Sequence, residues 1–420
     1  MGKTIVISGI TDTRNNGCWS MATALINGMR RETPGVQFVF LTHARSRDAE
    51  RLAAADIRFL ETPWSRARIP KIRVLQSLAC TFLLRANARL LARWGVNLFY
   101  PRFSRSLASA DLLVDLGGDS ISSDYNDYSV FFQVLPAALA HRLGIPYFFL
   151  AQSIGPFKDG WLYRWVKCVL SAAAAISVRE KISLNLLLQA GIDRNTIPVS
   201  DLAFLLSPLG GQGKSVLLDE VGICPGTSYV AISTSSLIGH YLGKRPNALE
   251  HLVDSMAALC DHLVESYRIR IVFISHVMFA GNDDREMSRK VKARMKFSDN
   301  ALLAERVFNG AELKAIIGEC QAMIAMRMHA AIAAVSQYVP VLVLAYNHKV
   351  HGIFTEKLGW GDLVLDVRQQ TEESLTKELF AKADRLLRTR SFLRRRLRES
   401  IPREIVKAQK NIRLVAERLR

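Results

Sequence analysis

The chain has 420 residues, 49% hydrophobic and 22% charged, a composition that allows two ordinary folded domains and excludes a collagen-like or largely disordered protein. Its formal net charge of +18 at pH 7 favours anionic partners. Six cysteines stand singly without zinc-ligand spacing, and no apolar run reaches about 18 residues, so we expect reduced thiols, no metal, no membrane span and a cytoplasmic protein.

Strand-like and helix-like segments alternate through the first half of the chain. The opening MGKTIVISGI predicts a strand rather than a signal peptide. Apolar and β-branched runs predict strands at 3–8, 36–41, 57–60, 112–116, 147–151, 176–179 and 197–199. Amphipathic segments such as 19–30 and 130–143 predict helices between them. This alternation is typical of a parallel sheet with helices on both faces.

Segment 66–105 has an unusual charge pattern. No acidic residue lies between Glu61 and Asp111. The basic residues there, interleaved with apolar ones, are Arg66, Arg68, Lys71, Arg73, Arg85, Arg89, Arg93, Arg102 and Arg105. Three interpretations stay open: solvated helix faces, a peripheral contact with an anionic membrane at its inner face, and nucleic-acid binding. We expect no nucleic acid, because no motif for it is present.

The alternation pauses at 207–226 and then restarts. The sequence SPLGGQGKSVLLDEVGICPG is rich in glycine and suggests a linker. Further strands are predicted at 229–233, 270–275, 302–307, 323–326, 339–345 and 363–367, with helices at 248–266 and 310–320. We predict two tandem doubly wound, Rossmann-like α/β domains at 1–208 and 227–384, a linker at 209–226, a basic helical tail at 385–420, and a cleft between the domains.

Polar residues follow several predicted strands of the first half. Ligands of doubly wound folds bind at the carboxyl ends of strands, so these residues are candidate ligand contacts. They are Asn16 and Gly17 in RNNGCWS, Gly118 and Asp119 in LGGDS, Gln152 and Ser153 in AQSIGP, Arg179 in ISVREKIS, and Asp201 in VSDLAF. Each has an ordinary alternative as a turn, a helix cap or a structural ion pair.

The second half carries two cations in an apolar run, AMRMHAAIAA. If 323–326 is a strand and Ala330 opens a helix, Arg327 and His329 lie in the turn, where they can meet an anion. The alternative for His329 is a buried structural histidine. Histidine ionises near neutral pH and can act as an acid or a base. After the next strand, YNHKVHG supplies Tyr346 and Lys349.

Together these motifs resemble the polysaccharide pyruvyl transferase family. The shared residues are the R-x-H of Arg327 and His329, then Tyr346, Lys349, Gly352, Leu358 and Gly359, preceded by NNGC, GGD, QSIGP, Arg179, Glu180, Ser183 and SD-x-AF at 200–204. The chain departs from the family at Leu202, often proline, at Tyr338, often glycine, and at Asp119, often a third glycine. The resemblance implies a two-domain GT-B-like fold.

It also implies that the enolpyruvyl unit of phosphoenolpyruvate is transferred to two hydroxyls of a sugar, giving a pyruvate ketal in exopolysaccharide or surface-glycan synthesis. The acceptor would be a glycan, free or lipid-linked. Such a donor needs fixed cations for its carboxylate and phosphate, and Arg179, Arg327 and Lys349 are candidates. His329 would move the proton, and no cofactor is required. The alternatives are a GT-B glycosyltransferase using a nucleotide sugar, supported by Glu312 and Glu319, and a basic scaffold without enzymatic activity.

Overall fold

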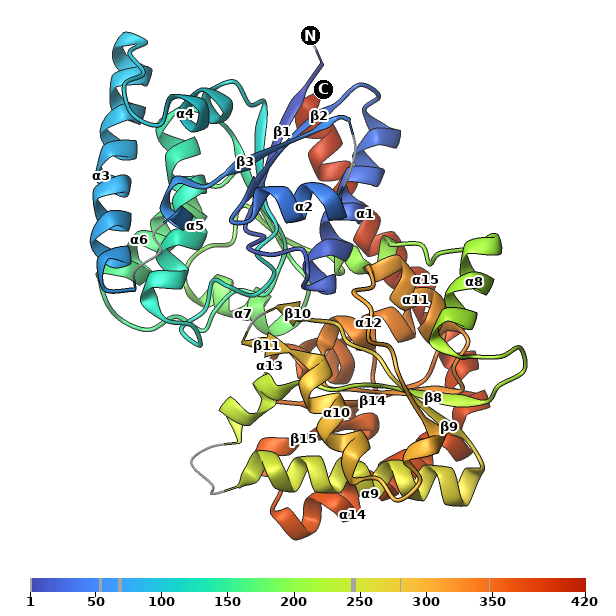
Figure 1. Cartoon of the computed structure of the whole chain (residues 1–420). Coiled ribbons are helices and arrows are strands. Elements are labelled where there is room, and N and C mark those ends of the chain that lie inside the picture. The colour runs from blue at the N-terminus through green and yellow to red at the C-terminus, as the bar shows by residue number, and fades with distance from the viewer. Residues whose placement is uncertain (1, 53–54, 67–69, 243–246, 280, 347) are drawn as a thin grey trace. The chain divides into compact units, whose positions relative to one another are not determined.

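The computed structural model describes residues 2–420 except 53–54, 67–69, 243–246, 280 and 347. The chain divides into two compact units (Figure 1). The first comprises Met1–Thr13, Met21–Leu202 and Lys407–Arg420, and the second comprises Arg14–Ser20 and Ala203–Val406.

A seven-stranded parallel sheet forms the centre of the first unit, in the order β3-β2-β1-β4-β5-β6-β7. Its strands are β1 Thr4–Ser8, β2 Gln37–Thr42, β3 Ile57–Glu61, β4 Leu112–Asp115, β5 Tyr147–Gln152, β6 Ala175–Val178 and β7 Thr196–Pro198. The helices of this part of the chain are α1 Asn16–Glu32, α2 Arg45–Arg51, α3 Pro70–Trp94, α4 Pro101–Ala108, α5 Asp127–Arg142, α6 Trp161–Ser171 and α7 Lys181–Gln189.

The second unit has a six-stranded parallel sheet in the order β12-β9-β8-β13-β14-β15. Its strands are β8 Tyr229–Ser233, β9 Arg270–Phe273, β12 Ala301–Leu303, β13 Ala322–Ala325, β14 Val341–Ala345 and β15 Val364–Asp366. A short antiparallel ribbon joins β10 Met278–Phe279 to β11 Asn282–Asp283. The helices are α8 Gly211–Val221, α9 Ala248–Tyr267, α10 Asp284–Arg294, α11 Gly310–Gly318, α12 Met328–Val335, α13 His348–Val350, α14 Glu372–Arg388 and α15 Arg390–Leu419.

The central strands are apolar because helices cover both faces of each sheet. Every residue of β4 and of β14 is buried, which is the pattern expected of parallel sheets. Each strand of the two large sheets corresponds to a predicted one, so the prediction of two doubly wound α/β folds is confirmed. The short β10–β11 ribbon was not predicted. Among the described residues, no helix has the length and apolar character needed to cross a membrane.

The boundaries of the two units differ from the predicted domain and linker boundaries. Residues 211–221 of the expected linker form α8, which buries Leu217 in the second unit, and Gly222 ends this helix in the left-handed conformation with φ of 81°. The glycines therefore flank a helix rather than form a linker.

The expected tail is likewise a folded element. From Lys407 onward it belongs to the first unit, where the buried Asn411 side chain accepts a hydrogen bond from Ser177 Oγ at 2.7 Å and donates one to the Ser200 carbonyl at 2.9 Å.

Each sheet has one point where the strand order reverses direction. In the first sheet it lies between β1 and β4, and in the second it lies between β8 and β13. Loops leaving the two strands diverge there and leave room for a ligand beyond the carboxyl ends. These two points are where a site is expected.

Candidate active site

Arg327 and His329 lie at the reversal point of the second sheet. β13 ends at Ala325, Arg327 has the extended conformation of a helix N-cap, and α12 starts at Met328. A strand and a helix flank the R-x-H motif as expected, but the helix starts at Met328 rather than at Ala330, so His329 lies in its first turn and not in the connecting turn. Arg327 is buried and His329 is half-buried.

The charge of Arg327 is balanced by a buried carboxylate. Its Nη2 donates to Asp284 Oδ1 at 2.6 Å and its Nε donates to the same oxygen at 3.1 Å. Nη2 also donates to Asn282 Oδ1 at 2.6 Å. Burial opposes the charged guanidinium, but Asp284 and Tyr346 outweigh it and hold the pKa of Arg327 above its ordinary value. The ion pair fixes the orientation of Arg327 at the start of α12.

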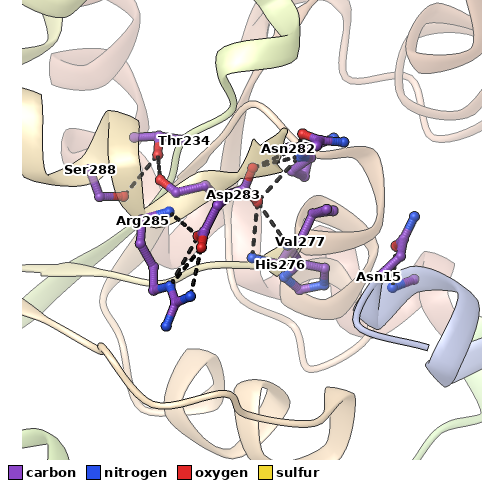
Figure 2. Close-up of polar contacts among 11 residues, drawn as sticks. Asn15, Thr234, His276, Val277, Asn282, Asp283, Arg285 and Ser288 are labelled. Atoms are coloured by element: carbon purple, nitrogen blue, oxygen red, sulfur yellow. Dashed lines mark hydrogen bonds and ion pairs between the residues drawn. The ribbon is translucent and has the colours of Figure 1, made fainter. Parts of the chain in front are cut away.

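Asp284 also ties this turn to the end of β9. Its Oδ2 accepts hydrogen bonds from the backbone N–H groups of His276 at 3.1 Å and Val277 at 2.9 Å. Figure 2 labels His276 and Val277 in this cluster of polar contacts. Burial raises the pKa of the Asp284 carboxyl, an effect that Arg327 and the two N–H groups oppose. One carboxylate therefore holds two loops of the site together.

His276 is a neutral imidazole in this cluster. Burial lowers its pKa to about 3, and the nearby charges of His329 and Arg327 act in the same direction. Its Nδ1 is buried and has no hydrogen-bond partner among the described residues. At neutral pH His276 therefore offers a hydrogen-bonding atom without adding charge.

Three buried serine hydroxyls lie at the same edge of the sheet. Ser233 is the last residue of β8, Ser235 follows that strand, and Ser275 follows β9. Their Oγ atoms are buried without a hydrogen-bond partner in the part of the chain that the structure describes. Buried polar atoms are nearly always satisfied, so three together indicate a place for a polar ligand. They were missed in the sequence, although ISTSS and ISHV follow predicted strands just as the chosen motifs do.

The NNG loop at the start of α1 lies beside His329. Asn16 N donates to the His276 carbonyl at 2.9 Å, and Gly17 N donates to Asn15 Oδ1 at 3.0 Å. A β-carbon on Gly17 would overlap the imidazole ring of His329. Glycine is therefore needed here for close approach, and the predicted contacts Asn16 and Gly17 are brought next to the predicted catalytic histidine.

Tyr346 and Lys349 come from the end of β14 and from α13. Both side chains are largely buried. The Tyr346 ring packs against that of Tyr241, with centroids 4.9 Å apart, and Tyr346 contributes to the raised pKa of Arg327. The structure thus gathers Arg327, His329, Tyr346, Lys349, Asn16 and Gly17 in the second unit.

The remaining predicted residues gather in the first unit, at the carboxyl ends of its strands. Arg179 follows β6 and is only 1% exposed. Its Nη1 donates to Asp201 Oδ2 at 2.7 Å and its Nε donates to Ser153 Oγ at 2.9 Å. The charge of Arg179 is therefore compensated within the first unit, and its catalytic role stays a prediction.

A buried carboxylate, Asp115, occupies the reversal point of the first sheet. It accepts hydrogen bonds from Ser8 Oγ at 3.0 Å, Gln133 Nε2 at 2.9 Å and Gln152 Nε2 at 3.0 Å. Burial raises its pKa to about 6. The loop glycine Gly117 leaves no room for a β-carbon, which would overlap the Gln133 amide. Asp115 was missed because it reads as the last residue of an apolar strand.

A cavity of about 330 Å³ opens beside this carboxylate network. Its lining combines hydroxyl, amide and imidazole groups with aromatic rings, and includes Ser8, His43, Trp64, Tyr128, Phe132 and Gln133. The Trp64 ring stacks on Phe132 with centroids 5.8 Å apart. Such a mixture of apolar surface and a few fixed polar groups is typical of a small-molecule site. Among the described residues, no group of His, Cys, Asp and Glu could hold a metal ion.

Comparison with known proteins identifies the family. The profile of the polysaccharide pyruvyl transferase family matches residues 20–348. The chain belongs to this family. The amylovoran biosynthesis protein AmsJ of Erwinia amylovora is 23% identical over 328 residues, which is 76% of this chain and 77% of AmsJ.

Solved structures with the same fold have low sequence identity to this chain. UDP-GlcNAc 2-epimerase from Neisseria meningitidis, bound to UDP-GlcNAc, superposes with a TM-score of 0.61 at 12% identity and covers 99% of both chains. A UGT transferase from Siraitia grosvenorii in complex with UDP gives a TM-score of 0.57 at 12% identity, covering 99% of this chain and 100% of its own. The fold is therefore GT-B-like.

Two departures from the family pattern can now be described structurally. Tyr338, where the family often has glycine, has φ of 62°, a left-handed conformation that glycine adopts without strain. Gly118 has φ of 69°, whereas Asp119 is not in the left-handed region, so its backbone does not require glycine. Asp119 donates its backbone N–H to the Gly117 carbonyl at 2.8 Å and is half-buried.

Proposed function

We propose that this protein transfers the enolpyruvyl unit of phosphoenolpyruvate to two hydroxyls of one sugar, forming a cyclic pyruvate ketal during exopolysaccharide or surface-glycan synthesis. Family membership and the relative named for amylovoran biosynthesis support this proposal. The observation that carries it is the half-buried His329, packed against Gly17 and flanked by the Arg327–Asp284 pair at the reversal point of the second sheet.

The donor is proposed to bind at this edge of the second unit. Phosphoenolpyruvate carries a carboxylate and a phosphate, so its site needs several hydrogen-bond donors and a positive potential. The hydroxyls of Ser233, Ser235 and Ser275 supply donors. Lys349 supplies a charge, and the first N–H groups of α12 favour an anion at its N-terminus. Arg327 orients this turn and contributes charge on the side away from Asp284.

In the proposed reaction, a sugar oxygen attacks C2 of the enol and loses its proton, while C3 gains a proton and becomes a methyl group. The C2–O bond to phosphate then breaks. The second sugar oxygen adds to C2 and passes its proton to the departing phosphate, which is released as inorganic phosphate. His329 takes a hydroxyl proton, delivers the C3 proton, or does both in turn. Assistance of this kind is worth roughly 10²–10⁴-fold in rate.

The cavity of the first unit is proposed to take the acceptor. Its aromatic rings suit the apolar faces of a sugar, and its hydroxyl and amide groups suit the sugar hydroxyls. Behind Gln133 in this wall lies Asp115, whose raised pKa makes its carboxylate a stronger proton acceptor than an ordinary aspartate. The identity of the sugar is left to experiment.

The deciding experiment incubates the protein with phosphoenolpyruvate and a panel of free and lipid-linked glycans. We expect phosphate release together with a product whose mass increases by pyruvate minus water. Phosphate release without that product would contradict ketal formation. Triple replacement of Ser233, Ser235 and Ser275 by alanine should raise KM for phosphoenolpyruvate by roughly tenfold or more, with a smaller effect on KM for the glycan.

A nucleotide-sugar glycosyltransferase is the second candidate, favoured by the likeness to folds solved with UDP and UDP-GlcNAc. Thermal melting separates the two candidates. Phosphoenolpyruvate should raise the melting temperature of the wild type and not that of the triple serine variant. A rise with UDP-sugars but none with phosphoenolpyruvate would favour the glycosyltransferase.

A further inference from the structure

Helix α3 of the first unit has one face packed and one face exposed. It packs against α4 and α5 (Figure 1) through buried side chains that include Cys80, Leu84 and Ala88. On the opposite face, Leu78 is 56% exposed and Phe82 is 73% exposed. The following turns of this face present Arg85, Arg89 and Arg93, all exposed. Their spacing of three and four residues places all five on one side of the helix.

The arginines of this face are close to one another and to Arg142 on α5. Burial lowers the pKa of Arg142, and the charges of Arg85 and Arg89 lower it further. None of these three arginines forms an ion pair with any acidic group that the structure describes. Like charges gathered in this way repel, and an anion between them would relieve the repulsion.

An apolar groove adjoins these arginines. It has a volume of about 250 Å³, with Arg85 and Arg142 in its wall beside Phe131, Leu135, Trp165 and Val169. The rings of Phe131 and Trp165 stack with centroids 5.1 Å apart. Fixed positive charge beside apolar surface suits a molecule with an anionic head and a hydrocarbon chain.

Large apolar side chains are also exposed at the end of α3 and just beyond it. Trp94 and Leu98 are each 62% exposed, and tryptophan is typical of the boundary between lipid headgroups and acyl chains. Residues 62–110 contain no acidic residue, so no carboxylate within this segment offsets the positive charge of its arginines.

We propose that this face, defined by Leu78, Phe82, Arg85, Arg89 and Arg142, docks on an anionic lipid bilayer. The aromatic and aliphatic side chains enter the headgroup boundary, and the arginines bind lipid phosphates. The proposal concerns 78–98 and α5, a part of the contact predicted for 66–105. Residues 67–69 of that segment lie outside the described residues. The inference does not depend on the reaction proposed above.

The test compares two triple variants of the full chain by vesicle flotation. Phe82→Ser with Arg85→Ser and Arg89→Ser removes one exposed phenylalanine and two exposed arginines from this face. Phe392→Ser with Arg395→Ser and Arg398→Ser removes the same set from α15, where all three are also exposed. The vesicles contain phosphatidylglycerol and phosphatidylethanolamine, or phosphatidylcholine alone, at about 0.15 M salt.

We expect the wild type and the α15 variant to float with the anionic vesicles and not with phosphatidylcholine. The α3 variant should lose roughly 25-fold in partition coefficient from its arginines alone, about fivefold each, with an unchanged melting temperature. Equal losses in both variants, or no flotation of the wild type, would overturn the proposal. The proposal would also be overturned if the wild type bound duplex DNA but neither kind of vesicle, and if the α3 variant lost the DNA binding.

Discussion

The two units place an arginine–aspartate pair beyond the carboxyl ends of their strands, but they surround it differently. In the first unit, Arg179 pairs with Asp201 and both side chains are almost fully buried. In the second, Arg327 pairs with Asp284 beside buried hydroxyls that have no partner among the described residues. The proposal therefore assigns a structural role to the pair of the first unit and a ligand-binding role to the surroundings of the pair in the second unit.

His329→Ala should have the largest effect on activity, because His329 is the proposed proton-transfer group of the second unit. The variant should lose roughly 10²–10⁴-fold in kcat, because it removes the proposed proton-transfer group, while its melting temperature stays close to that of the wild type. Phosphate release with phosphoenolpyruvate and the active glycan measures the effect. Near-normal turnover would remove His329 from the reaction.

Asp284→Ala should both destabilise the protein and disorder the candidate site around Arg327. Loss of the carboxylate leaves Arg327 buried without its partner, which costs about 3–5 kcal/mol, and it frees the loop at His276. Asp201→Ala, the matched change in the first unit, should cost a similar free energy of unfolding. Urea unfolding measures both.

The two variants should differ in donor binding by the folded protein. Asp284→Ala should weaken the binding of phosphoenolpyruvate far more than Asp201→Ala does. An equal weakening would mean that Arg179 and Arg327 are equally involved with the donor, as the sequence motifs suggested.

The carboxyl of Asp115 makes stability depend on pH. Its pKa rises from 3.8 to about 6 on folding, so its contribution is fully present below pH 3.8 and is lost as the pH rises through about 6. The loss amounts to about 3 kcal/mol, since each pKa unit is worth about 1.4 kcal/mol. Asp115→Asn should flatten the stability profile between pH 4 and 6, measured by urea unfolding. An identical profile in the variant would contradict the raised pKa.

Gly17→Ala tests whether the NNG loop positions His329. The added methyl group would overlap the imidazole, and a shift of about 1 Å in a catalytic group can cost roughly 10²-fold in rate. We expect kcat to fall while KM for phosphoenolpyruvate changes little. Gly210→Ala serves as the control, because Gly210 has φ of −115° and a β-carbon there meets nothing within 4 Å.

The sequence predicted the strands of the two large sheets well because most of them are short, largely buried apolar runs. It predicted the R-x-H site because two cations in an apolar run are unusual. It missed the partners of those cations. Asp284 is 43 residues from Arg327, and only the topology of the second sheet brings them together. Ser233, Ser235 and Ser275 look like ordinary loop serines until their burial is known.

The linker was wrong for a related reason, and the tail is helical as predicted but is packed in the folded units rather than separate from them. A glycine-rich sequence is found both at helix ends, as at α8, and in flexible linkers, so composition does not separate the two. The sequence of a basic amphipathic helix such as α15 likewise does not show which surface the helix packs against. These are questions of tertiary packing, which local patterns address only through burial periodicity.

The return of the last residues to the first unit has a consequence for synthesis. Asn411 bonds to Ser177 and Ser200, and Lys407–Arg420 packs in the first unit. Domains usually fold in order as the ribosome delivers them. Here residues 203–406, which form most of the second unit, leave the ribosome before residues 407–420, so the first unit gains these contacts only after the second unit has been translated.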